Sequence, residues 1–304
     1  MAAVAYGVSD FVGGVASRRV AALRVVIVSY PLSLVIVLIA APFVSGTLTL
    51  NGLIWGAIAG VTSGLAVWWF YLALATGPMS VVSPLTAVLV AGIPVLVGFA
   101  FGERPGLIAY LGIAVALVAV VLVSRESPDD TAGEVAGGIT LRFTRQVALL
   151  TVGSGGAFAL SFIALHQIGE GSGLWALAVS RGAATVVVWL VAQAAGHFVL
   201  PRGEPLKLAV YVSVLDVVAN GTMIYAFQGG MLSLVSVIGS LYPAATVLLA
   251  MVMLGERVSR VQQAGMLLAL AAVGMIAVAG ARFFSSSSVF SSSVSAASVS
   301  RRCA

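Results

Sequence analysis

Long apolar runs are the feature that most constrains this chain. Ten can be counted, each near the roughly 20 residues that a helix needs to cross a bilayer. They lie at 2–17, 23–44, 52–76, 80–101, 106–124, 147–168, 174–200, 206–228, 231–254 and 261–281. Lipid offers the backbone no hydrogen-bond partner, so each run is predicted to be a helix. Continuous runs such as 111–123 argue against a β-barrel, whose strands alternate in hydropathy.

The composition supports a membrane protein and excludes several other classes. Of 304 residues, 61% are hydrophobic and 8% are charged, whereas soluble domains carry about 25% charged residues. A soluble enzyme, a nucleic-acid binder and a disordered chain are therefore excluded. The net charge of +5 resides mostly on Arg residues between the apolar runs, as in loops at a membrane surface. A lone cysteine, Cys303, leaves no disulfide framework.

The chain is predicted to contain two related halves. The only sizeable polar segment, 125–145, divides the ten runs into five and five. The tripeptide Gly-Glu-Arg ends the fourth run at 102–104 and the ninth at 255–257, and two glycines, a serine and a valine match in the same register. We expect an all-α membrane protein with ten transmembrane helices. Residues 1–124 form its first repeat, 146–281 its second, and 282–304 a Ser-rich disordered tail.

Five helices in each repeat have a geometric consequence. The second repeat must enter the membrane from the side opposite to the first, and such inverted repeats are common in secondary transporters with a site near the midplane. The loops after runs 1, 5, 7 and 9 carry most of the basic residues, which places both termini outside. The first run has no basic residues before it, so it is interpreted as a helix rather than a signal peptide.

Two segments and the paired Gly-Glu-Arg turns resemble EamA-type members of the drug/metabolite transporter superfamily. The segments are 7–11 (GVSDF) and 73–84 (ALATGPMSVVSP), and the resemblance covers about residues 1–281. It implies a ten-helix carrier with two five-helix repeats, and many such carriers export amino acids or other small metabolites. It also implies cytoplasmic termini, which disagrees with the Arg count and leaves the orientation open.

Ionisable residues inside the runs are the first candidates for a transport site, since each costs at least about 2.5 kcal/mol at the bilayer centre. Asp216 and Asn220 share one helix face. We interpret that face as a cavity wall where Asp216 binds a proton or a cation, with a structural Asp–Arg pair as the alternative. Asp10 is a second candidate proton carrier, or a carboxylate solvated at the interface. Arg181 could bind a substrate carboxylate, but a structural role beside Asp10 or Asp216 is favoured.

Aromatic residues supply further candidates for substrate binding. Trp68 and Tyr71 could stack on an organic substrate, with an interfacial aromatic belt as the alternative. Tyr225 continues the helix of Asp216. Tyr242 precedes Pro243 inside the ninth run, where the proline either frees a carbonyl toward a cavity or only kinks the helix.

Two series of glycines and two glutamates at the ends of runs are interpreted as structural. Two series of glycines spaced by four residues predict close helix packing. They comprise Gly52, Gly56, Gly60 and Gly64, and then Gly98, Gly102 and Gly106. Glu103 and Glu256, each followed by an arginine, are interpreted as loop anchors at the membrane surface.

These features favour a secondary transporter of small organic metabolites or drugs. It is expected to work by alternating access around a central cavity, as an exporter in a bacterial plasma membrane, with protons as the candidate coupling ion. A metal site, a nucleotide-binding loop and a catalytic motif are not recognised, so no enzyme activity and no cofactor are expected. The alternatives are an uncoupled facilitator and a membrane scaffold or receptor that transports nothing. Lipid and a small molecule are the expected partners, and no nucleic acid.

Overall fold

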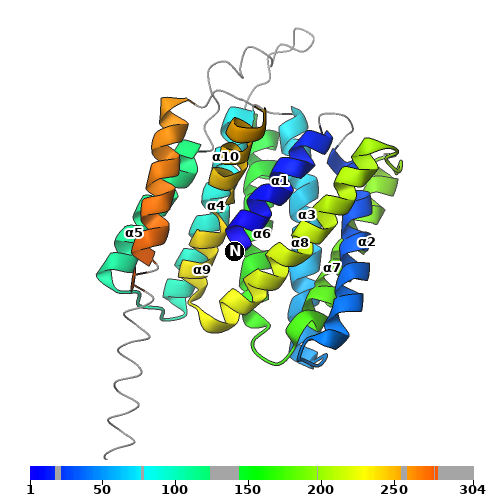
Figure 1. Ribbon diagram of the computed structural model, residues 1–304, viewed down its shortest axis with the longest axis horizontal. Coiled ribbons are helices and arrows are strands. Elements are labelled where there is room, and N and C mark those ends of the chain that lie inside the picture. Colours follow the sequence, from blue (N-terminus) through cyan, green and yellow to red (C-terminus); the bar gives the residue numbers. More distant parts are fainter. Residues whose placement is uncertain are drawn as a thin grey trace, which may run out of the picture.

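The computed structural model of this chain is a single bundle of helices that pack side by side (Figure 1). It describes residues 1–17, 22–76, 79–123, 144–196, 198–254, 259–276 and 278–279, and no strand occurs among them. The α-helices are α1 Ala2–Ser17, α2 Ala22–Ala40, α3 Leu50–Thr76, α4 Met79–Ala100, α5 Leu107–Val123, α6 Arg145–Gln167, α7 Gly173–Ala194, α8 Glu204–Gly229, α9 Leu232–Gly239 and α10 Tyr242–Leu254. The last apolar helix covers Arg260–Ile276.

Every predicted run contains a helix, so the all-α prediction is confirmed. Five of the described helices are long and apolar enough by themselves to cross a membrane. They contain Leu23–Phe43, Leu50–Phe70, Arg145–Gln167, Gly173–Ala194 and Glu204–Gly229. The predicted polar segment 125–145 lies almost wholly, and the Ser-rich tail wholly, outside the described residues.

Two runs differ from the prediction. The seventh was expected to reach residue 200, but α7 ends at Ala194 because Gly196 takes a φ of +66° and its N–H bonds back to the carbonyl of Gln193. The ninth run is not one helix but two. Ser240 and Leu241 separate α9 from α10 just before Pro243.

The helices form a closed ring whose neighbours come alternately from the two halves of the chain. Around the ring, α2 contacts α7, α7 contacts α3, α3 contacts α6, α6 contacts α4, and α4 contacts α9. The α9–α10 pair then contacts α1, α1 contacts α8, and α8 contacts α2 again. Helix α5 and the last helix lie outside the ring, where α5 residues such as Ile113 pack against Ala269 and Ile276.

The contacts between neighbours in the ring recur when each helix is exchanged for the one of equal rank in the other half. The α3–α6 contact becomes α8–α1, α3–α7 becomes α8–α2, and α4–α6 becomes the contact of α9 and α10 with α1. The α2–α7 and α4–α9 contacts map onto themselves. A pseudo-twofold axis therefore passes through these two contacts, and the repeats are inverted.

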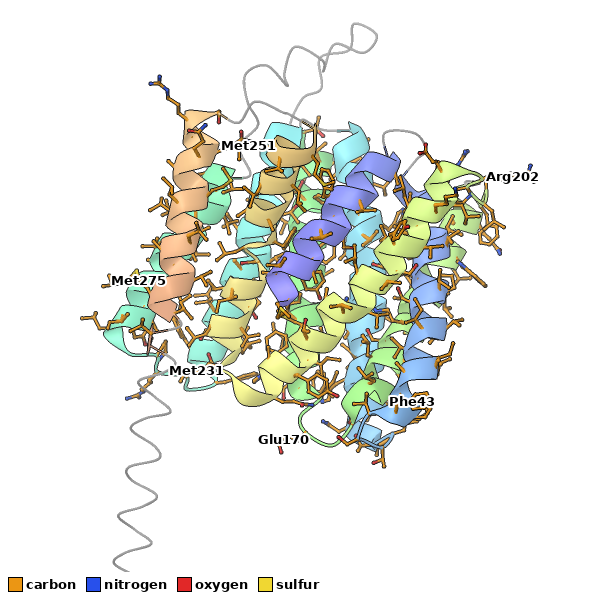
Figure 2. All side chains as sticks on the ribbon, viewed as in Figure 1. Phe43, Glu170, Arg202, Met231, Met251 and Met275 are labelled. Carbon is orange, nitrogen blue, oxygen red and sulfur yellow. The ribbon has the colours of Figure 1, made fainter. Side chains whose placement is uncertain are left out.

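The two ends of the bundle can be named from residues labelled in Figure 2. Arg202 and Met251 lie at one end, the Arg202 end, whereas Phe43, Glu170 and Met231 lie at the other, the Glu170 end. Helix α2 runs toward the Glu170 end and its counterpart α7 runs away from it (Figure 1). Helices of equal rank thus run in opposite directions, as inversion requires.

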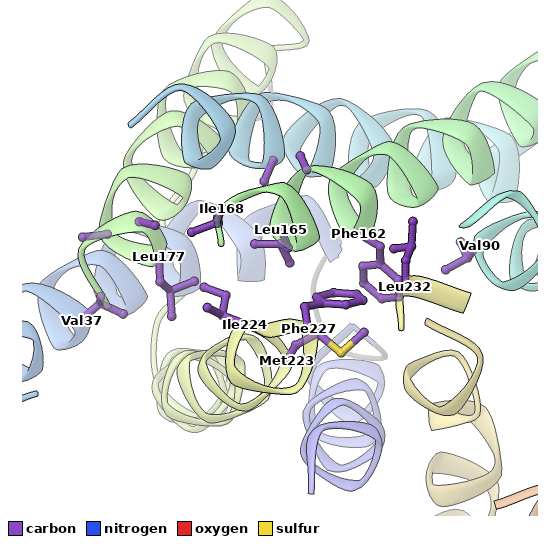
Figure 3. Packing of buried hydrophobic residues seen from close by; sticks show 14 residues of the cluster. Val37, Val90, Phe162, Leu165, Ile168, Leu177, Met223, Ile224, Phe227 and Leu232 are labelled. Carbon is purple, nitrogen blue, oxygen red and sulfur yellow. The ribbon is translucent and has the colours of Figure 1, made fainter. Parts of the chain in front are cut away.

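The largest apolar core is displaced toward the Glu170 end. We call it the central cluster, and it joins helices on all sides of the ring (Figure 3). Its large members are Val37, Val90, Phe162, Leu165, Ile168, Leu177, Met223, Ile224, Phe227 and Leu232. Toward the Arg202 end, the described clusters join only two or three adjacent helices, for example Val26 of α2 with Val188 of α7. The central cluster therefore closes the ring toward the Glu170 end.

The first glycine series packs α3 against α7, as its spacing predicts. A Cβ added to Gly56 would lie 2.6 Å from the carbonyl oxygen of Ala176, and one added to Gly60 would collide with the carbonyl oxygen of Ser180. The prediction for Gly102 and Gly106 is wrong. Both lie in the turn after α4, where an added Cβ would have no neighbour within 4 Å.

This packing predicts a large difference between two Gly→Ala substitutions. Gly60→Ala forces α3 away from α7 and should lower the free energy of unfolding by about 1–3 kcal/mol. Gly92→Ala in α4 is the control, because its Cβ meets nothing within 4 Å and alanine favours a helix. Thermal unfolding in detergent measures both. Equal melting temperatures for the two variants would contradict the close α3–α7 contact.

Candidate functional site

A buried ion pair joins α7 to α8 at the side of α2. Arg181 Nη1 lies 3.2 Å from Asp216 Oδ1, and the two side chains are only 5% and 14% exposed. The Arg181 guanidinium also lies over the ring of Tyr30 from α2, 5.3 Å from the ring centroid. Buried charges are costly unless they are paired and hydrogen-bonded. The structural Asp–Arg pair, which the sequence analysis gave as the alternative for Asp216, is thus present. It also agrees with the structural role that was favoured for Arg181.

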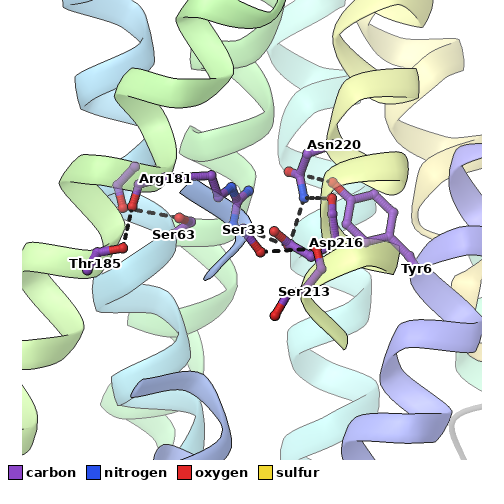
Figure 4. A network of polar contacts seen from close by, with 9 residues as sticks. Tyr6, Ser33, Ser63, Arg181, Thr185, Ser213, Asp216 and Asn220 are labelled. Atoms are coloured by element: carbon purple, nitrogen blue, oxygen red, sulfur yellow. Dashed lines mark hydrogen bonds and ion pairs between the residues drawn. The ribbon is translucent and has the colours of Figure 1, made fainter. Parts of the chain in front are cut away.

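Asn220 extends this pair toward α1. Its Nδ2 donates to Asp216 Oδ1 at 3.0 Å and to the Asp216 carbonyl oxygen at 2.9 Å, as a spacing of four on one helix face allows. Its Oδ1 accepts a 2.8 Å hydrogen bond from the Tyr6 hydroxyl. We call Arg181, Asp216, Asn220 and Tyr6 the polar network (Figure 4). It connects three ring helices, α7, α8 and α1.

The break between α9 and α10 lies beside this network. Tyr242, the first residue of α10, has its ring centroid 6.3 Å from that of Tyr6. Pro243 has no N–H, so it cannot continue the helical hydrogen bonds of α9. At the break Ser240 turns its hydroxyl back to the carbonyl of Val237 at 2.8 Å. The discontinuity therefore brings Tyr242 next to the polar network.

Asp10 lies on the network side of α1 but belongs to no hydrogen bond or ion pair within the described residues. It is four residues from Tyr6 and shares its helix face. It lies close enough to Asp216 and to Tyr242 for electrostatic interaction with both. Its side chain is nevertheless exposed, whereas Asn220 and Arg181 are buried.

Three predicted site residues are not brought into this group. Tyr225 is 44% exposed and lies on a face of α8 different from that of Asn220. Trp68 is partly buried in α3, and the adjacent Trp69 packs its ring against Gly153 of α6. Tyr71 lies in α3, but its side chain is outside what the structure describes.

Sequence reasoning missed Tyr6 and Tyr30. The sequence does contain a signal for Tyr6, because a tyrosine four residues before Asp10 shares one helix face with it. Tyr30 precedes Pro31 in the middle of an apolar run, but nothing in the sequence connects it to Arg181. Both tyrosines reach the site from helices that the chain order separates widely from α7 and α8.

Two polar atoms of the ion pair keep unused bonding capacity. Arg181 Nε and Asp216 Oδ2 are buried without a hydrogen-bond partner in the described part of the chain. Such groups are costly to bury, and rearrangement or a ligand would satisfy them. Among the described residues no group of three or more His, Cys, Asp or Glu side chains could hold a metal ion.

Comparison with known proteins identifies the family of this chain. The model of the EamA-like transporter family matches residues 1–125 and 146–278, one region in each half of the chain. No curated protein matches. One solved structure, titled only "Crystal structure of protein", has a TM-score of 0.70, with 17% identity over 93% of this chain and 96% of the other. That likeness concerns the fold, and the ten-helix architecture of two repeats is confirmed. The chain belongs to the EamA-like transporter family of the drug/metabolite transporter superfamily.

Proposed function

We propose that this multi-pass membrane transporter is a gradient-driven carrier for a small organic molecule, which binds beside the polar network. The observation that carries the proposal is the buried Arg181–Asp216 pair inside a ring of apolar helices. Ionisable groups at such depth mark substrate or ion pathways more often than they serve stability. The direction is export and the location is a bacterial plasma membrane, as the resemblance and the Arg-rich composition suggest.

The packing supports alternating access. The central cluster blocks the Glu170 end, whereas Asp10, one turn beyond Tyr6 toward the Arg202 end, remains exposed. We assign the described conformation to a carrier whose site is reached from the Arg202 end. A substrate would meet Tyr6, Tyr242 and the unsatisfied atoms of the ion pair, where a neutral or zwitterionic organic molecule finds both donors and acceptors.

Substitutions at the ion pair separate a structural role from a transport role. Asp216→Ala leaves Arg181 buried without its partner and should lower stability by about 3–5 kcal/mol. The double variant Arg181→Met, Asp216→Leu replaces the pair with apolar side chains and should recover most of that loss. Thermal unfolding in detergent measures stability, and flux into proteoliposomes measures transport.

The double variant decides whether the pair serves transport. We expect it to be folded but to transport at less than about a tenth of the wild-type rate. That decrease corresponds to a rise of roughly 1.4 kcal/mol or more in the activation free energy of transport. Wild-type flux in the stable double variant would show that the pair only holds the helices together.

Asp10 is the group to which we assign proton exchange. The sequence favours Asp216 for this role, but Asp216 Oδ1 already accepts hydrogen bonds from both Arg181 and Asn220, which a proton on that oxygen would displace. Asp10 has no such partner among the described residues, so a proton can bind and leave without breaking the network.

Asp10→Asn should therefore remove proton coupling while leaving substrate binding intact. We expect exchange of substrate across proteoliposome membranes to persist, and uphill transport driven by a pH gradient to fall at least about tenfold. Glu170→Gln, at an exposed loop carboxylate, is the matched control and should retain both activities. Full pH-driven transport in Asp10→Asn would refute the assignment, and wild-type flux insensitive to pH and sodium would identify an uncoupled facilitator.

A further inference from the structure

Glu103 lies in the loop after α4 and forms a contact between the two halves of the chain. It follows α4, and its Oε1 accepts the N–H of Leu232 at 2.5 Å while its Oε2 accepts the N–H of Ser233 at 3.0 Å. These N–H groups belong to the first turn of α9, where they have no partner within the helix. Met231, the residue before α9, supplies no side-chain cap. A carboxylate of the first repeat thus caps a helix of the second.

Two glycines near the end of α4 help to position the Glu103 carboxylate. A Cβ at Gly98 would collide with Glu103 Oε2, so the carboxylate could keep its present place only because residue 98 has no side chain. The Glu103 N–H bonds back to the Gly98 carbonyl oxygen at 2.9 Å, and Gly102 takes a φ of +89°, a conformation that favours glycine. Arg104, in contrast, is exposed, so the expected Glu–Arg loop anchor is not what Glu103 forms. Glu256, its counterpart in the second half, lies outside the described residues.

The capped turn is also part of the closed end of the bundle. Leu232 is fully buried and belongs to the central cluster, together with Phe162 and Phe227. The α4–α9 contact is one of the two through which the pseudo-twofold axis passes. Any pathway to the Glu170 end must part the central cluster, and the first turn of α9 cannot move away from α4 while Glu103 holds its N–H groups.

We propose that Glu103 is a latch that holds α9 in the conformation closed at the Glu170 end. Its two hydrogen bonds involve a charged acceptor at a helix N-terminus, which makes them stronger than ordinary caps. Release of the carboxylate shifts the population toward the conformation open at that end. The latch rests on the proposed alternating access, but it predicts a structural equilibrium that can be measured without substrate.

A buried reporter cysteine measures that equilibrium. In a Cys303→Ser background, Ala164→Cys places a thiol in the central cluster, where Ala164 is 1% exposed. A maleimide reacts with it only when the cluster parts. Purified protein in detergent is compared with and without Glu103→Gln. We expect this substitution to raise the labelling rate about tenfold, as loss of a helix cap shifts an equilibrium.

Two controls keep the result interpretable. Arg104→Gln removes the neighbouring exposed charge and should leave the rate within about twofold, well below the effect of a lost cap. A second reporter, Ala119→Cys on α5, is buried outside the ring and should label at an unchanged rate in Glu103→Gln. If Glu103→Gln does not fold, Glu103→Asp, whose shorter side chain weakens the same bonds, should give a smaller increase.

The outcomes divide clearly. Faster labelling at residue 164 alone supports the latch, even if the protein transports nothing in a flux assay. An unchanged rate at residue 164 overturns it, and so does an equal rise at both reporters, because that would mean general loosening. A carrier that transports normally with an unchanged rate would retain the proposed function and lose only the latch.

Discussion

An odd number of helices in each repeat is the constraint on which this structure depends. Five crossings force helices of equal rank to run in opposite directions, so each half can complete the other only across a twofold axis in the membrane plane. The ring satisfies this by placing every helix between two from the other half. Neither repeat can then close the ring alone. The apolar faces of α1 and α8, or of α3 and α6, are buried only when both halves are present.

The symmetry of the ring is broken where the charges lie. At the offset that aligns the Gly-Glu-Arg turns, Asp216 corresponds to Ser63, an uncharged residue whose hydroxyl donates to the carbonyl of Gly60 in its own helix. Pro243, in the first turn of α10 after the break, corresponds to Val90, and α4 continues unbroken through that position. The scaffold is thus shared by both repeats, whereas the ion pair and the broken helix belong to the second. The substrate site that we propose therefore lies where the two repeats differ.

The sequence predicted the helices well because lipid leaves the backbone few choices. The positions of the runs and the α3 glycine series follow from local pattern, whereas the early end of α7 and the break between α9 and α10 were not predicted. The site was predicted less completely. The spacing of Asp216 and Asn220 placed them on one face, but the partner of Asp216 depends on how α7 and α8 meet α2, which no local pattern contains. Glu103 shows the same limit, because its adjacent arginine suggests a local pair while its real partner lies 129 residues away.

The inverted ring can be tested most directly by locating two equivalent loops. Thr47, between α2 and α3, lies at the Glu170 end, where its N–H donates to the carbonyl oxygen of Gly171. Arg202, between α7 and α8, lies at the other end (Figure 2). Single cysteines at these positions, in a Cys303→Ser background, are exposed to a membrane-impermeant maleimide in intact cells. The inverted architecture predicts that one of the two is labelled and the other only after the cells are lysed. Labelling of both positions in intact cells, or of neither, would contradict it.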